Sequence, residues 1–174
     1  KAASTAAVNG ESIISQSTRF MQRLKNIAND EDIFIITRFA PTGKTLGRGS
    51  WEEVETKAAK PHVYREEDAI DQNANVYYTI NPRDRFNGNG QGKKEDISRV
   101  VAFFADIDVG TIGHKKASPF NTNEEALQAL DAFPLEPSII VDTGHGVQAL
   151  WLFKEAVDIS PSFTIADYEA INRG

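Results

Sequence analysis

The chain has 174 residues, of which 40% are hydrophobic and 25% charged, a balance typical of one soluble globular domain with a substantial core. It contains no cysteine, which excludes disulfides, thiol catalysis and thiolate zinc sites, and no apolar run approaches the roughly 20 residues that cross a bilayer. The formal net charge of -6 argues against a protein that coats nucleic acid by global attraction, although a local basic groove remains open.

The first half of the sequence predicts one helix and two main strands. Apolar residues recur at helical spacing over 11–28, after ten residues without periodicity that we expect to form a mobile tail. β-branched and aromatic residues then predict strands at 33–39 and 75–80. Less regular stretches predict a turn at 47–50, a short strand at 63–64, a short helix at 66–72 and a flexible Gly- and Asn-rich passage at 86–92.

The second half predicts a more regular series of elements. An almost wholly apolar strand at 100–108 precedes a helix that begins after Thr122, where Thr122 and Glu125 have the spacing of a capping box. Strands at 138–142 and 147–153 flank a hairpin whose glycines allow positive backbone angles. A last helix is expected from Thr164.

Asp106 and Asp108 stand two residues apart at the end of the apolar strand. Because side chains alternate across a strand, both carboxylates should emerge on one face, where they repel each other unless a proton, a basic group or a divalent cation compensates. Mg²⁺ and Mn²⁺ favour such oxygen ligands, and paired ions of this kind support phosphoryl transfer. The alternative is that both carboxylates only satisfy amides of the following turn.

Two segments in this order, 103–110 (FFADIDVG) and 138–151 (SIIVDTGHGVQALW), resemble the archaeo-eukaryotic primase superfamily, particularly the primase-polymerase domains of phage and plasmid replication proteins. The stretch 76–83 is similar to the strand that precedes the catalytic one in that family, so the resemblance covers about 32–153. It implies an α+β fold with an RRM-like, palm-type, mixed or antiparallel sheet, packed helices and a smaller N-terminal α/β unit. We expect residues 11–174 to form a single catalytic domain, truncated at its carboxyl end.

The resemblance also implies a chemistry. Asp106 and Asp108 would be catalytic and would bind two Mg²⁺ or Mn²⁺ ions. The reaction would transfer a nucleotide from NTP or dNTP to a 3′-hydroxyl on a single-stranded DNA template. Family members place a third carboxylate on a later strand; we find no acidic residue in a strand context after Phe153, and expect it beyond Gly174. The implied setting is a replication protein with a helicase domain as its candidate continuation. From the lack of cysteine, of a secretory signal pattern and of a long apolar run, we expect a cytoplasmic location and no membrane partner.

Five residues are candidates for binding the nucleotide. The family usually has histidine where this chain has Gln148, which can donate a hydrogen bond to a phosphate without neutralising it. His145 in the hairpin, Arg83 after the second strand, and Lys115 and Lys116 after the acidic strand could also meet phosphates. The alternatives are that turn backbone satisfies Gln148, that His145 is an exposed turn residue and that the lysines are only solvated.

Two further functions stay open at this point. A non-catalytic module that binds single-stranded nucleic acid would keep the sheet without the chemistry. A nucleotidyl cyclase or other palm-type enzyme would also use paired carboxylates, but would leave the glycine hairpin without an obvious task.

Overall fold

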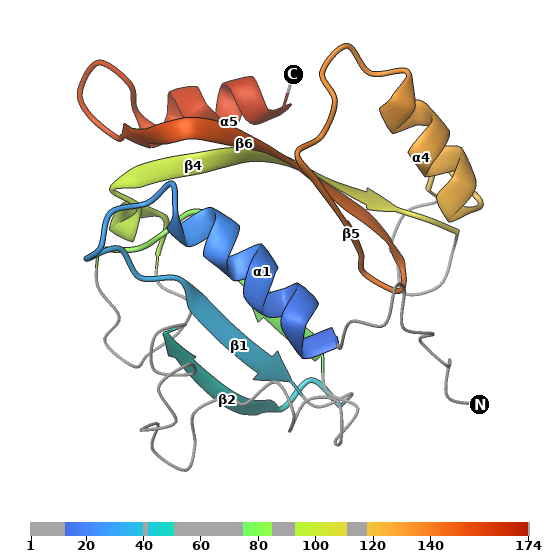
Figure 1. Ribbon diagram of the computed structural model, residues 1–174, viewed down its shortest axis with the longest axis horizontal. Helices are drawn as coiled ribbons and strands as arrows, with labels where there is room; N and C mark the ends of the chain where they lie inside the picture. Colours follow the sequence, from blue (N-terminus) through green and yellow to red (C-terminus); the bar gives the residue numbers. More distant parts are fainter. Residues whose placement is uncertain (1–12, 40–41, 51–74, 85–92, 111–117, 174) are drawn as a thin grey trace.

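The computed structural model describes residues 13–39, 42–50, 75–84, 93–110 and 118–173. These residues form an α+β fold with two three-stranded antiparallel sheets and three α-helices (Figure 1). The predicted tail at 1–10, the elements at 63–64 and 66–72, and the passage at 86–92 lie outside the described residues. The elements are α1 (Ile13–Lys25), β1 (Ile35–Phe39), β2 (Thr45–Ser50), β3 (Asn75–Tyr78), the 3₁₀ helix η2 (Lys94–Asp96), β4 (Arg99–Asp108), α4 (Asn123–Asp131), β5 (Ile139–Asp142), β6 (Gly146–Asp158) and α5 (Ile165–Arg173).

The first sheet has the order β2-β1-β3, with the β-branched strand β1 at its centre. The turn predicted at 47–50 is wrong, because these residues belong to β2 and pair with β1, Arg48 opposite Thr37. The Arg48 side chain donates a hydrogen bond from Nε to the buried Thr37 Oγ1 at 3.0 Å. Pairing with a neighbouring strand thus outweighs the low strand preference of glycine, and the turn itself lies at Gly43, where φ is +84°.

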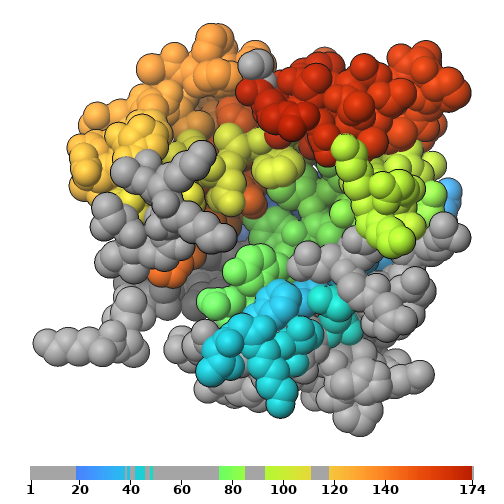
Figure 2. Space-filling view, turned by 180° about the vertical axis from the view of Figure 1, so that it is seen from behind, coloured from blue at the N-terminus to red at the C-terminus, as the bar shows by residue number. Residues whose placement is uncertain are grey.

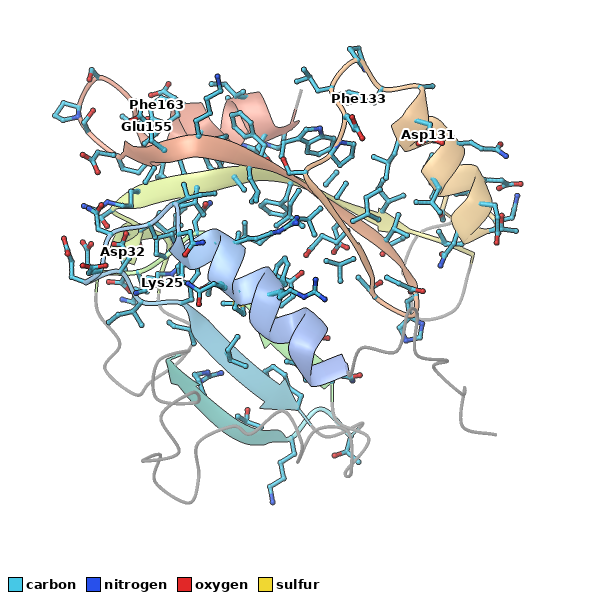
Figure 3. The ribbon with its side chains drawn as sticks, viewed as in Figure 1. Lys25, Asp32, Asp131, Phe133, Glu155 and Phe163 are labelled. Carbon is cyan, nitrogen blue, oxygen red and sulfur yellow. The ribbon has the colours of Figure 1, made fainter. Side chains whose placement is uncertain are left out.

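The second sheet has the order β4-β6-β5, and the 13-residue strand β6 is its centre. β6 continues five residues beyond the predicted end at Phe153 because Arg99, at the start of β4, pairs with Asp158. The prediction that no acidic residue follows Phe153 in a strand is therefore wrong, since Glu155 and Asp158 both lie in β6. Figure 3 labels Glu155, at the end of the sheet remote from the 143–146 hairpin. Neither residue brings a third carboxylate to Asp106.

Helices cover the two faces of the second sheet differently. α4 packs Ala126 and Leu130 on Val147 and Ala149 of β6, and Tyr168 of α5 stacks on Phe103 of β4. α1 covers part of the opposite face and lies between the two sheets (Figure 1). Its Met21 and Leu24 belong to one buried cluster with Phe34, Ile36, Ile80 and Leu150. The face that carries α1 therefore looks toward the first sheet.

Several local predictions are confirmed. Thr122 caps α4 by accepting a hydrogen bond from the Glu125 amide at 3.2 Å, whereas the Glu125 carboxylate accepts from the amide of Asn121, one residue earlier than a regular capping box requires. The last helix begins at Ile165, directly after the predicted start. Within the described residues, no helix has the length and apolar character needed to cross a membrane.

Candidate functional site

Asp106 and Asp108 both emerge on the face of β4 that looks toward the first sheet. Strand pairing is regular from Ala102 to Asp108, so the alternation of side chains puts the two carboxylates on one face, and both residues are exposed. Across the ladder, Asp106 lies opposite Gln148 and Asp108 opposite Gly146. The two sequence segments that carry the predicted chemistry thus meet as neighbouring strands.

Tyr78, the last residue of β3, links this face to the first sheet. Its hydroxyl donates a hydrogen bond to Gln148 Oε1, and its ring packs edge-to-face against Phe20 of α1 with centroids 4.8 Å apart. Burial raises the pKa of Tyr78 to about 12, and the negative charge of Asp106 contributes in the same direction. Tyr78, Gln148 and Asp106 therefore form one polar cluster, which we call the Tyr78 cluster.

The sequence did not identify Tyr78 as a site residue. Tyr77 and Tyr78 are adjacent residues at the end of β3. The structure separates them: Tyr77 is 53% exposed and packs against Phe39, whereas Tyr78 turns toward the second sheet. The sequence could have predicted this difference, because side chains alternate along a strand and adjacent tyrosines of β3 therefore point to opposite faces.

The glycine hairpin is held closely against the end of β4. The amide of Val109 donates to the carbonyl of His145 at 3.0 Å, and the amide of Thr143 donates to the carbonyl of Gly146 at 3.0 Å. A Cβ added to Gly146 would lie 2.1 Å from the carbonyl oxygen of Ile107, so only glycine allows this approach. His145 is exposed at the turn, and the contacts that the structure gives it are made by its backbone.

Arg83 lines a cleft together with Gln148, whereas Asp106 and Asp108 are not among its lining residues. The cleft has a volume of about 540 Å³ and runs between α5 and the stretch that follows β3. Figure 2 shows from behind how residues 75–84, in green, which comprise β3 and the stretch after it, lie between α5, in red, and the other strands of the first sheet, in cyan. Arg83 Nη1 donates to the carbonyl of Asn81 at 3.1 Å, while its Nε is buried without a partner among the described residues. Burial lowers the pKa of Arg83, and Asp96 opposes this effect.

The remaining predictions concern two lysine side chains and the metal ions. Lys115 and Lys116 lie outside the described residues, so their relation to the site stays a prediction. Within the described part of the chain, no three Asp, Glu or His residues gather in a metal-binding cluster. The exposed carboxylates of Asp106 and Asp108, on one face of a strand, are hard oxygen donors of the kind that Mg²⁺ and Mn²⁺ prefer, and in this respect they fit such ions.

Comparisons of the chain with models of protein families, with curated proteins and with solved structures find no match. Its chemistry must therefore be inferred from its own side chains. They provide a pair of carboxylates beside an amide that can donate hydrogen bonds. All three groups lie on the face of the second sheet that looks toward the first sheet.

Proposed function

We propose that this chain is the nucleotidyltransferase domain of a DNA primase or polymerase of a replication protein, using NTP or dNTP on a single-stranded DNA template. The observation that carries the proposal is the pairing of Asp106 with Gln148 across β4 and β6. It places a carboxylate pair, which could hold divalent cations, next to a neutral hydrogen-bond donor, and cations and donor together could bind a triphosphate.

The arrangement of the second sheet also supports the proposal. β4, α4, β5, β6 and α5 follow one another along the chain, and α4 and α5 pack on the same face of the sheet. α1 covers part of the opposite face, and the same face carries Asp106, Asp108 and Gln148. This is how an RRM-like sheet with helices packed behind it would present a catalytic face.

Asp106 and Asp108 would hold Mg²⁺ or Mn²⁺. When bound, these ions neutralise phosphate charge and favour ionisation of the attacking hydroxyl. In the reaction, the 3′-oxygen forms a bond to the α-phosphorus of the nucleotide, the bond to the bridging oxygen breaks, pyrophosphate leaves and the hydroxyl proton passes to solvent. Gln148 would donate hydrogen bonds to phosphate oxygens, which positions the triphosphate without adding charge.

The test is incorporation of labelled nucleotide on a primed and an unprimed single-stranded DNA template in the presence of Mg²⁺ or Mn²⁺. Asp106→Ala and Asp108→Ala should each lower incorporation by at least roughly a hundredfold, because each removes an anionic ligand that acts on the transition state. Asp131→Ala is the matched control, since Asp131 is an exposed carboxylate at the end of α4. Its activity should equal that of the wild type.

Other outcomes would identify the alternatives. Template binding that persists in Asp106→Ala, with no incorporation by the wild type under either metal, would establish a non-catalytic nucleic-acid-binding module and overturn the proposal. Turnover of nucleotide that needs no template would instead indicate a cyclase-type enzyme.

A further inference from the structure

The carboxamide of Gln148 offers two chemically opposite edges. Its oxygen accepts hydrogen bonds, whereas its NH₂ group donates two, so the orientation of the amide decides whether a phosphate is attracted or repelled. The Tyr78 hydroxyl, which donates to Gln148 Oε1, occupies the accepting edge. The donating edge is then the one available to a ligand.

We propose that Tyr78 is a positioning residue that fixes the amide of Gln148 so that its NH₂ group is offered to phosphate oxygens beside Asp106. This inference rests on the proposed function, because it assigns the nucleotide phosphates as the acceptors. Tyr78 itself touches neither substrate nor metal; it acts through Gln148.

The surroundings of Tyr78 make it suited to hold another side chain in place. Its backbone is paired with Ile36 in the first sheet, and the next residue, Thr79, donates from its amide to the carbonyl of Ile35 at 3.0 Å. The edge-to-face contact with Phe20 packs the ring against α1. Because its backbone and its ring are both held in place, Tyr78 loses little further freedom when its hydroxyl bonds to Gln148, so the bond can fix the amide.

The orientation of the amide matters because Gln148 carries no charge. A protonated histidine or a lysine at this position would attract a phosphate by its charge, whereas a neutral amide attracts it only through correctly directed N–H groups. An amide turned by 180° would present its oxygen to the phosphate and repel it. Loss of the Tyr78 hydroxyl should therefore weaken nucleotide binding although it leaves Gln148 in place.

The first experiment compares Tyr78→Phe with Tyr77→Phe. The former removes only the hydroxyl that contacts Gln148; the latter removes a hydroxyl from an exposed ring that packs against Phe39. We expect Tyr78→Phe to weaken binding of a Mn²⁺-bound, non-hydrolysable dNTP analogue, and to raise KM, by about three- to tenfold. The value of kcat should change less, and Tyr77→Phe should match the wild type. In a Gln148→Ala background, Tyr78→Phe should have no further effect.

The second experiment needs no activity. ¹⁵N relaxation of the Gln148 side-chain NH₂ group should show an ordered amide in the wild type and a mobile one in Tyr78→Phe. Unchanged order and unchanged affinity in Tyr78→Phe would overturn the inference while leaving the proposed function intact. A further loss of affinity in the Gln148→Ala background would also overturn it, because Tyr78 would then act by another route. If the wild type neither incorporates nor binds nucleotide, the proposed function is overturned. The assignment of nucleotide phosphates as the acceptors of the Gln148 NH₂ group is then overturned as well.

Discussion

Gln148 of β6 is the direct cross-strand partner of Asp106 of β4, and both side chains emerge on the face that looks toward the first sheet. Directly opposite residues in an antiparallel pair are close enough for their side chains to interact. The pairing depends on register, because a slip of one residue would send Gln148 to the face covered by α4. The apolar residues on either side of Gln148 hold that register: Val147 and Ala149 pack under α4, and Leu150 packs under α1.

Metal binding should stabilise the wild type and not the acidic-pair variants. At a Mn²⁺ concentration about ten times the dissociation constant, binding to the folded state alone adds about 1.4 kcal/mol to the free energy of unfolding. We expect a corresponding rise in Tm for the wild type, and little or none for Asp106→Asn or Asp108→Asn. Thermal unfolding of each protein with and without Mn²⁺ measures this rise in Tm.

Asp131→Asn is the control for this measurement, since it removes an exposed carboxylate from α4 without touching β4. Its Mn²⁺-dependent rise in Tm should equal that of the wild type. A rise of the same size in Asp106→Asn and Asp108→Asn would show that the ion binds elsewhere on the chain.

Tyr78 should give the protein a specific alkaline instability. Its pKa of about 12 lies above the ordinary phenol value of 10.0, so the folded state holds the phenolic proton more tightly than the unfolded state does. The stabilisation is complete below the ordinary value and is lost as pH rises toward the folded value. Compared with Tyr78→Phe, the wild type should lose roughly 1 kcal/mol more on going from near pH 8 to near pH 11. Urea unfolding at both pH values measures the difference, and equal losses in the two proteins would contradict it.

The sequence predicted the second sheet better than the first, and the reason is physical. Thr122 and the apolar strand of β4 carry strong local signals, so their elements were placed correctly. β2 was missed because Gly47 and Gly49 have little intrinsic preference for strands, and only pairing with β1 makes them extended. The length of β6 likewise depends on a distant partner, Arg99.

The candidate site was likewise predictable only where local sequence patterns determine it. Asp106 and Asp108 could be placed on one face from the alternation of a single strand. Tyr78 could not be placed against Gln148, because the two residues are 70 positions apart and meet only when the two sheets pack around α1. Contacts between sheets depend on tertiary packing, for which local sequence patterns carry no signal.

Arg99 should be important for stability at the end of the sheet remote from the site. Its Nη1 lies 2.6 Å from Asp32 Oδ1, and its Nε lies 3.1 Å from Asp158 Oδ1. Asp32, labelled in Figure 3 beside Lys25, is only 1% exposed. Arg99→Ala would remove the guanidinium that contacts this buried carboxylate, and we expect a loss of about 3–5 kcal/mol in the free energy of unfolding.

Lys94→Ala is the matched control for Arg99→Ala. Lys94 and Glu169 form an ion pair of the same 2.6 Å length, but both side chains are substantially exposed, so its removal should cost less than about 1 kcal/mol. Urea unfolding of both variants measures the contrast. Similar losses of unfolding free energy in the two variants would mean that the burial of Asp32 does not determine how much its ion pair stabilises the fold.

The hairpin offers a final prediction in which two neighbouring glycines should behave differently. Gly144 has φ +81° and open space around its Cα, so Gly144→Ala should cost only the backbone strain, about 1–2 kcal/mol. Gly146→Ala would put a Cβ 2.1 Å from the backbone oxygen of Ile107, which cannot move without opening the β4–β6 ladder. We expect a loss of about 3 kcal/mol or more.

The effect of Gly146→Ala should also reach the site, because Gly146 is the cross-strand partner of Asp108. A hairpin displaced from β4 would separate the carboxylates from Gln148, so Mn²⁺-dependent nucleotide binding should fall in Gly146→Ala and persist in Gly144→Ala. Urea unfolding and nucleotide titration of the two variants measure both effects. Equal stability and equal affinity in the two variants would show that the hairpin does not approach β4 this closely, and that the carboxylates and Gln148 are held together by other contacts.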